Sequence, residues 1–129
     1  MDMFTVPALI YLRESVLDAQ RTPEYAALYG GGMSPEQYEA FEDARAETAR
    51  LAWQPYMFNP SLPHLLEGVV NAPTLLVWGR DDRVVPFSAA QVYQRSLKNA
   101  RIVALQACGH RPEVEKSEQF INEVQKFLD

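Results

Sequence analysis

The fold of this chain is decided by the stretch APTLLVWGRDDRVVP, residues 72–86. Its first half, Thr74 to Trp78, is an almost unbroken apolar run that Gly79 closes. Such a run is typical of a parallel strand that is covered on both faces. Its second half places charged residues directly after the strand, where open α/β sheets carry their active sites. The stretch therefore predicts a parallel strand followed by a functional loop.

The residues after this stretch predict three further elements. We expect a helix over Ser88–Leu97, a second strand over Arg101–Gln106 and a final amphipathic helix over Lys116–Leu128. The inner stripe of that last helix is expected to hold Phe120, Ile121, Val124, Phe127 and Leu128. Strand, helix, strand and helix form one right-handed parallel unit, so the predicted class is α/β.

The first half of the chain carries only helical signals. Ser34 suits an N-cap, Pro35 suits the first helical position, and Gln37 completes a capping box, so a helix should start here and end before Pro55. The residues expected on its inner face are Tyr38, Phe41, Ala44, Thr48 and Leu51. Apolar residues near helical spacing predict an earlier helix over residues 6–17, and a short segment follows over residues 23–29. The triplet at residues 30–32 is interpreted as a hinge.

Composition bounds the class of protein. The chain has 129 residues, 47% hydrophobic and 22% charged, which fits one modest globular domain and excludes wholesale disorder. The net charge is −5 and no stretch concentrates Lys or Arg, so a nucleic-acid partner or anionic membrane is not expected. The single cysteine, Cys108, offers no metal cluster and fits a reducing compartment. We therefore expect a cytoplasmic protein without metal or cofactor.

Two loops combine titratable residues with a favourable position in the fold. One runs from Gly79 to Pro86 and the other from Cys108 to Pro112. Because parallel strands end at the same edge of a sheet, an aspartate of the first loop is expected to meet His110 of the second. A carboxylate bonded to one imidazole nitrogen fixes the tautomer and leaves the other nitrogen to act as a base.

These motifs resemble the α/β-hydrolase superfamily. The resemblance is carried by residues 72–86, by Cys108-Gly109-His110, and by Glu115 with the closing helix. In that family the triad acid follows the seventh strand, three residues beyond a glycine, and the histidine directly follows a glycine after the eighth strand. Carried over, this makes Asp82 the acid and His110 the base. Their separation of 110 − 82 = 28 residues leaves room for one helix and one strand.

The resemblance also covers the first half. Residues 53–63, WQPYMFNPSLP, resemble the end of the helical cap that precedes the seventh strand in many bacterial members. It implies a cap- or lid-like segment over residues 1–68 and a C-terminal core segment over residues 69–129, with the acid and histidine loops. The acid loop looks most like that of hydrolases that cleave dienoic ring-fission products and of related esterases.

The nucleophile of the family is missing from these residues. It normally lies in a Gly-x-Ser-x-Gly turn, and none of the chain's serines has glycines at that spacing. Ser34 is expected to cap a helix instead, and His64 to lie at the surface or to pack. In the family the nucleophile precedes the cap, so the chain is expected to begin after it. The chain would then supply two triad members and be inactive alone.

Three alternatives stay open at this point. In the first, Cys108 is a nucleophile paired with His110, although a residue at a strand end is expected to pack under the loop. In the second, Asp81 faces His110 in place of Asp82; otherwise Asp81 caps the loop or pairs with Arg83. Arg111 stands where relatives often carry an apolar residue, and it is expected to point to solvent.

Two functions compete on this basis. The first is the C-terminal part of a serine-type hydrolase of ester or C–C bonds, with a small ester-like substrate once an N-terminal half completes it. The alternative is a non-catalytic module that keeps the hydrolase outline as a scaffold. Two parallel strands make a poor sheet with exposed edges, so we also predict self-association into a homo-oligomer.

Overall fold

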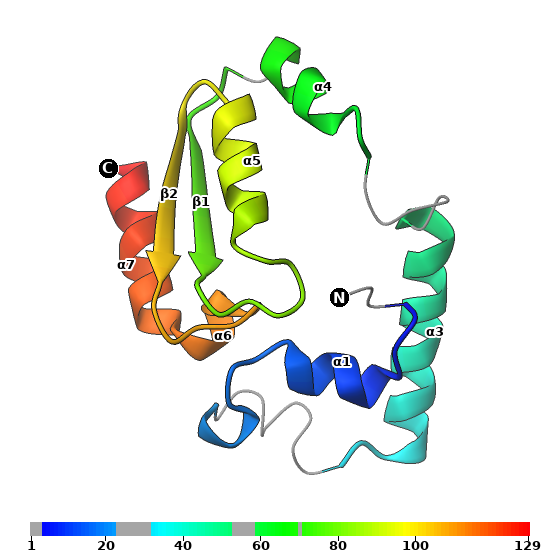
Figure 1. The fold of residues 1–129 in the computed structure, drawn as a ribbon. Coiled ribbons are helices and arrows are strands. Elements are labelled where there is room, and N and C mark those ends of the chain that lie inside the picture. Colours follow the sequence, from blue (N-terminus) through cyan, green and yellow to red (C-terminus); the bar gives the residue numbers. More distant parts are fainter. Residues whose placement is uncertain (1–3, 23–31, 53–58, 70) are drawn as a thin grey trace.

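The computed structural model describes residues 4–22, 32–52, 59–69 and 71–129. Its centre is a sheet of two parallel strands, β1 (Thr74–Gly79) and β2 (Ala100–Leu105), drawn in Figure 1. The register places Thr74 opposite Ala100 and Gly79 opposite Leu105. Both strands therefore end at the same edge, as predicted, and their following loops start side by side. The α/β class is confirmed.

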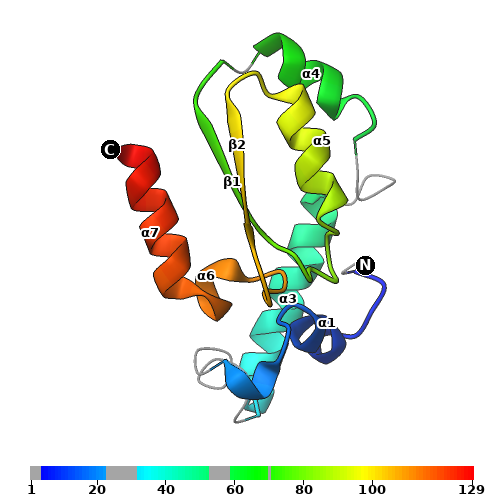
Figure 2. The same ribbon diagram turned by 60° about the vertical axis from the view of Figure 1, so that its left-hand side comes forward.

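Helices cover both faces of this sheet. Helix α5 (Ser88–Ser96) joins the strands and lies on one face, while α7 (Ser117–Leu128) lies on the other, which Figures 1 and 2 show from two directions. A single turn, α6 (Pro112–Glu115), precedes α7. Packing on both faces explains the unbroken apolar run of β1. The predicted strands and helices of this half agree with the structure to within about one residue.

The predicted inner stripe of α7 is only partly correct. Phe120, Val124 and Phe127 are half-buried, but Ile121 is 52% exposed and Leu128 is 76% exposed. The physical reason is the width of the sheet. Two strands are too narrow to cover the whole apolar side of a helix of three turns.

The described residues of the N-terminal half form helices, as predicted. It contains α1 (Ala8–Glu14), the 3₁₀ turn η1 (Ala19–Arg21), α3 (Pro35–Ala52) and α4 (Leu62–Val69). The capping box is confirmed, because the Gln37 N–H donates to Ser34 Oγ at 3.3 Å and the Ser34 N–H donates to Gln37 Oε1 at 2.9 Å. The prediction for residues 23–29 and the first two residues of the glycine triplet lie outside the described residues, as do residues 53–58 of the quoted cap stretch.

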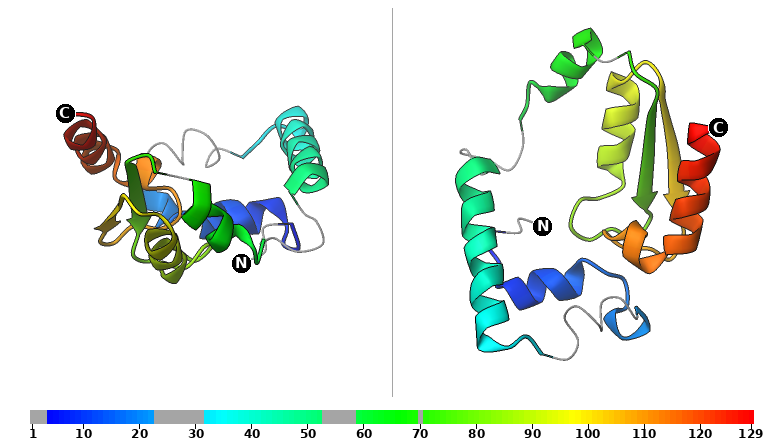
Figure 3. Two further views of the ribbon diagram at one scale, coloured as in Figure 1. Left: turned by 90° about the horizontal axis from the view of Figure 1, so that it is seen from above. Right: turned by 180° about the vertical axis from the view of Figure 1, so that it is seen from behind.

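Helix α3 is attached to α1 through one arginine. Arg45 Nη2 donates to the Val6 carbonyl at 2.8 Å, and its guanidinium lies 5.9 Å from the ring centre of Tyr11. Figure 3 shows α1 between α3 and the edge of the sheet that carries the loops. The predicted inner face of α3 is correct only for Phe41, which is half-buried, whereas Leu51 is 84% exposed and Tyr38 is 39% exposed. Helix α1 has 7 residues and α3 has 18, so α1 is too short to cover the apolar side of α3.

The buried apolar residues gather at the loop edge of the sheet. The most buried members come from the end of α1, from the two loops and from the first turn of α5: Leu12, Val16, Val84, Ala90, Leu105 and Cys108. Leu97 is also buried, but it lies at the end of α5, near the opposite edge where β1 and β2 begin. The α1 end therefore packs directly on the loops that follow β1 and β2. The core and the candidate site share the same region.

Two glycines allow close backbone contacts, Gly79 between the two loops and Gly109 between the histidine loop and residues 16–17. A Cβ on Gly79 would lie 1.9 Å from the Gly109 carbonyl oxygen and 2.4 Å from that of Cys108. A Cβ on Gly109 would lie 3.0 Å from the Leu17 nitrogen. No side chain fits at Gly79 without separating the two loops. Glycine is required here by contact, not by backbone conformation.

We predict that Gly79→Ala lowers the free energy of unfolding by about 3 kcal/mol, because the added methyl group must push the loops apart. Gly32→Ala is the matched control. It also adds one methyl group, which meets nothing within 4 Å, at a φ of 76° that costs about 1 kcal/mol. Chemical denaturation of both variants checks the difference. Equal losses would contradict the close approach of the two loops.

Candidate active site

Asp82 is fixed by the turn of its own loop. Its Oδ1 atom accepts the N–H groups of Val84 and Val85, both at 2.8 Å. The loop is tied back to β1 because Trp78 Nε1 donates to the Val85 carbonyl at 3.1 Å. These bonds leave Oδ2 to face His110 Nδ1 at 2.9 Å. The Asp82 side chain is only 3% exposed.

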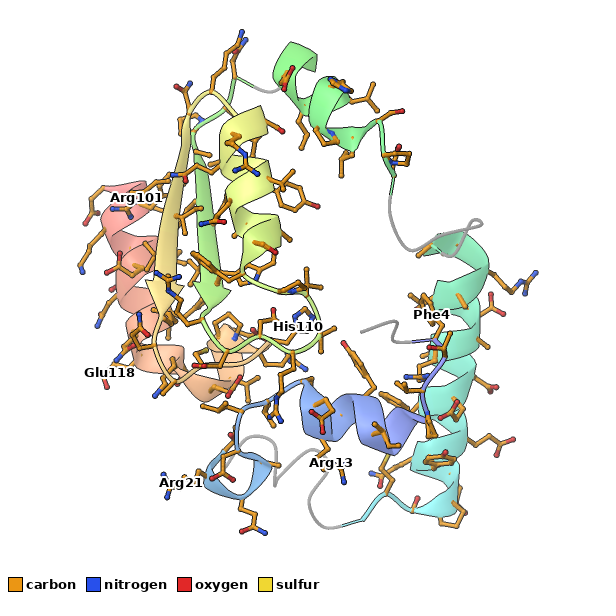
Figure 4. The ribbon with its side chains drawn as sticks, in the orientation of Figure 1. Phe4, Arg13, Arg21, Arg101, His110 and Glu118 are labelled. Carbon is orange, nitrogen blue, oxygen red and sulfur yellow. The ribbon has the colours of Figure 1, made fainter. Side chains whose placement is uncertain are left out.

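His110 approaches the same point from the loop after β2. Its backbone N–H donates to the Ser15 carbonyl at 3.0 Å, and its side chain stays 28% exposed. Figure 4 labels His110 at the loop edge of the sheet, on the side toward α1. The structure therefore brings together Asp82 and His110, as the parallel-strand argument expects.

The carboxylate of Asp82 is held in its charged form. Burial alone raises the pKa of Asp82, but the hydrogen bonds from His110 and from the Val85 and Val84 N–H groups together outweigh it. The pKa of Asp82 therefore lies below its ordinary value of 3.8. Because this carboxylate is ionised at neutral pH, His110 Nδ1 must carry the hydrogen between them. The lone pair then lies on Nε2, where it can accept a proton from a third group.

The other sequence candidates lie apart from this pair. Asp81 is exposed, and its backbone N–H donates to the Cys108 carbonyl at 2.9 Å, so Asp82 and not Asp81 meets the imidazole. The Cys108 thiol is fully buried, and burial together with the charge of Glu115 raises its pKa to about 12. Such a thiol stays protonated at neutral pH and is a poor nucleophile.

Three further residues have ordinary positions. Ser34 caps α3, and His64 is exposed on α4. Arg111 pairs with Glu113 in its own loop and is partly exposed.

Sequence reasoning missed two charged residues that fasten the loops to the end of α1. Arg83, next to Asp82, donates from Nη2 to the Val16 and Leu17 carbonyls at 2.9 Å each, and its Nη1 pairs with Glu14 Oε2 at 3.1 Å. Arg83 therefore pairs with Glu14, whereas one sequence alternative pairs it with Asp81. Glu115 accepts the Gly109 and Leu17 N–H groups. The only sequence signal for Glu115 was its place in the family resemblance.

A cavity of about 290 Å³ opens beside the pair. Besides Asp82 and His110, its walls are formed mainly by apolar and aromatic residues: Val77, Trp78, Pro112 and Phe120. A larger cavity of about 430 Å³ lies between α4 and α5 and touches neither site residue. The smaller one is the relevant cavity because chemistry requires the titratable pair.

Two features, a metal-binding cluster and a membrane-spanning helix, are absent from the residues that the structure describes. No group of three or more His, Cys, Asp or Glu side chains in that part of the chain is placed to hold a metal ion. Among the same residues, no helix has the length and the apolar character needed to cross a membrane.

Parts of the chain are similar in sequence to known hydrolases. No family model matches the chain. A 2-hydroxy-6-oxononadienedioate/2-hydroxy-6-oxononatrienedioate hydrolase from Paraburkholderia xenovorans is 40% identical over 78 residues, which is 60% of this chain and 26% of that protein. A pimeloyl-(acyl-carrier protein) methyl ester esterase from Nitrosomonas europaea is 42% identical over 53 residues, covering 41% of this chain and 21% of the esterase.

Solved structures agree on the fold. The crystal structure of 2-hydroxy-6-oxo-6-phenylhexa-2,4-dienoate hydrolase from Rhodococcus sp. strain RHA1 superimposes on 92% of this chain and on 42% of that protein, with a TM-score of 0.68 at 21% identity. These similarities match the α/β-hydrolase superfamily, and the chain has the architecture of the C-terminal portion of that fold. It spans about a quarter of the length of the curated relatives it matches.

The Asp82 carboxylate makes the stability of the fold depend on pH. Because its pKa is lowered in the folded state, its contribution is fully present above its ordinary value of 3.8 and is lost as pH falls through the lower folded-state value. We predict that the free energy of unfolding of Asp82→Asn falls less than that of wild type as the pH is lowered from about 5 to about 2. Denaturant titrations at each pH measure this slope.

Asp81→Asn is the control for that experiment, since it removes an exposed neighbouring carboxylate and should keep the wild-type slope. Some acid dependence should survive in Asp82→Asn, because the pKa values of Glu36 and Glu123 are also lowered. Identical slopes for wild type and Asp82→Asn would refute the ionised, hydrogen-bonded state of Asp82.

Proposed function

We propose that this chain supplies the acid and the base of a serine-type α/β-hydrolase. Asp82 orients the imidazole and stabilises its charged form, and His110 acts as general base and then general acid. The observation that carries this proposal is the 2.9 Å contact between Asp82 Oδ2 and His110 Nδ1 at the carboxyl edge of a parallel sheet.

The nucleophile must come from outside these residues, since they contain no Gly-x-Ser-x-Gly turn. In the proposed first step, His110 Nε2 takes the hydroxyl proton of that serine as its oxygen attacks the substrate carbonyl. The proton then passes to the leaving group as its bond to the carbonyl carbon breaks. In the second half of the reaction, His110 Nε2 takes a proton from water as the water oxygen attacks the acyl-serine carbonyl. The same proton then passes to the serine oxygen as its bond to the acyl carbon breaks, which releases the acid product and restores the serine.

The substrate class follows from the relatives and from the cavity. One relative named above is a methyl ester esterase, and the other is a hydrolase of 2-hydroxy-6-oxononadienedioate, an unsaturated keto-diacid. The cavity beside His110 has apolar walls, which favour the hydrocarbon part of a small molecule. We therefore infer hydrolysis of an ester or a C–C bond in a small substrate, within a reducing compartment such as the cytoplasm.

Residues 1–68 fit the role of a cap in this proposal, with residues 69–129 as the core segment. Support comes from the end of α1, which lies against both site loops. The Ser15 carbonyl receives the His110 N–H, and the carbonyls of Val16 and Leu17 receive Arg83. A cap in this position would hold the two site loops in place, while the walls of the 290 Å³ cavity come from residues 69–129.

A chimera tests the proposed function directly. This chain would replace the matching segment of the Paraburkholderia hydrolase, whose remaining part would supply the nucleophile. We predict hydrolysis of the substrate class in that enzyme's name, and a loss of about ten-thousand-fold in kcat for either Asp82→Asn or His110→Ala. The 129-residue chain alone should not hydrolyse an activated ester above the buffer rate.

Asp81→Asn in the same chimera is the matched control and should keep the activity, since Asp81 does not contact His110. A folded chimera without activity would count against the proposal. Turnover by the 129-residue chain alone, abolished by His110→Ala, would show that the nucleophile does not come from outside.

A second candidate function is favoured by the unfinished surface of the fold. In the described part of the chain the sheet has two strands, so each strand keeps an edge without a strand partner. Large apolar side chains are also exposed on three helices: Leu51, Leu65, Ile121 and Leu128. We infer a self-associating, non-catalytic module as the alternative, in which a second copy covers these surfaces.

Light scattering distinguishes this alternative from the monomer. We predict a mass above the 14.6 kDa of one chain, and a shift of that mass toward the monomer in Ile121→Lys. Glu118→Gln, a polar change on the same helix, is the control and should leave the mass unchanged. A compact monomer at the highest attainable concentration would rule out self-association.

A further inference from the structure

Glu115 makes two hydrogen bonds to backbone groups that are far apart in sequence. Its Oε1 atom accepts the Gly109 N–H at 2.8 Å, and its Oε2 atom accepts the Leu17 N–H at 2.7 Å. Gly109 directly precedes His110, whereas Leu17 belongs to the segment after α1. One carboxylate thus joins the histidine loop to the N-terminal half of the chain.

The same two segments are joined by a second, parallel contact. The His110 N–H donates to the Ser15 carbonyl at 3.0 Å. The backbone N–H groups of Gly109 and His110, which follow one another in the histidine loop, are therefore both held by hydrogen bonds. A Cβ on Gly109 would lie 2.9 Å from Glu115 Oε1 and 3.1 Å from the Val16 carbonyl carbon, so the segments are in close contact.

We propose that Glu115 is a positioning residue for His110, acting by holding the backbone of the histidine loop against residues 15–17. The catalytic consequence rests on the proposed function above, but the structural coupling does not. If the peptide before His110 is free to rotate, the imidazole can leave the 2.9 Å contact with Asp82. A displacement of about 1 Å in such a site costs about a hundredfold in rate.

The carboxylate group is specifically required by this arrangement. Both oxygens accept a backbone N–H, and bonds from N–H groups to a charged acceptor are stronger than neutral ones. Glutamine has the same shape but only one accepting oxygen, so Glu115→Gln must lose one of the two bonds. Aspartate keeps both oxygens but is shorter by one methylene group. Glu115→Gln keeps the size of the side chain, so it distinguishes the role of the two hydrogen bonds from the role of packing.

Amide hydrogen exchange in the 129-residue chain tests the coupling. We expect Glu115→Gln to accelerate exchange of the Gly109 or Leu17 N–H by about tenfold or more. The Nδ1 proton of His110, observed by NMR, should broaden in the same variant because the ring exchanges between positions. In the chimera described above, kcat should fall about 10- to 100-fold with little change in KM.

Two control variants make the result specific. Glu118→Gln removes a carboxylate from the start of α7 that lies on the outside of the molecule, as labelled in Figure 4, and should leave all these signals unchanged. Gly32→Ala destabilises the fold elsewhere and should leave the Nδ1 proton signal of His110 unchanged. A normal Nδ1 signal and normal amide exchange in Glu115→Gln would overturn the proposal.

Failure of this proposal and failure of the proposed function give different results. An inactive chimera, with the His110 signal still dependent on Glu115, would remove the function and keep the positioning role. An active chimera that Glu115→Gln does not slow would remove the positioning role alone. Should Glu115→Gln not fold, the wild-type chain decides: fast exchange of both the Gly109 and Leu17 N–H groups would overturn the proposal, and slow exchange would support it.

Discussion

The backbone contact between the loops after the two strands is the constraint on which the rest of the site depends. Gly79 lies so close to the carbonyls of Cys108 and Gly109 that no side chain fits between them. Since Asp82 is three residues beyond one glycine and His110 directly follows the other, this contact sets the distance between acid and base. Parallel strand pairing brings the loops to one edge, and the glycines let them close.

Charged side chains then convert a close approach into a defined geometry. The turn after β1 satisfies one oxygen of Asp82 with two backbone N–H groups, so that only the other oxygen faces His110. Arg83 and Glu115 hold the two loops to the backbone of residues 15–17. Residues 15–17 thus contribute backbone groups that support the site. This explains how a sheet of only two strands can keep an acid and a base in register.

Much of this could be predicted from the sequence, for reasons that are local. The apolar run of β1 and the capping box at Ser34 act over a few residues, and two parallel strands bring Asp82 and His110 to one edge by topology. The contacts of Glu115 could not be predicted, because Leu17 lies 98 residues away and backbone groups leave no pattern in the sequence. The exposure of Leu51 and Ile121 was also missed, since an apolar stripe predicts a buried face but not the surface that covers it.

In this structure the chain by itself forms an oriented acid–base pair, and ¹⁵N NMR of the His110 ring in the 129-residue protein tests this at neutral pH. In the neutral ring we expect Nδ1 to carry the hydrogen and Nε2 to carry none. Asp82→Asn should reverse this preference because its amide group then donates toward Nδ1. A ring with Nε2 protonated in the wild-type chain, unchanged by Asp82→Asn, would contradict it.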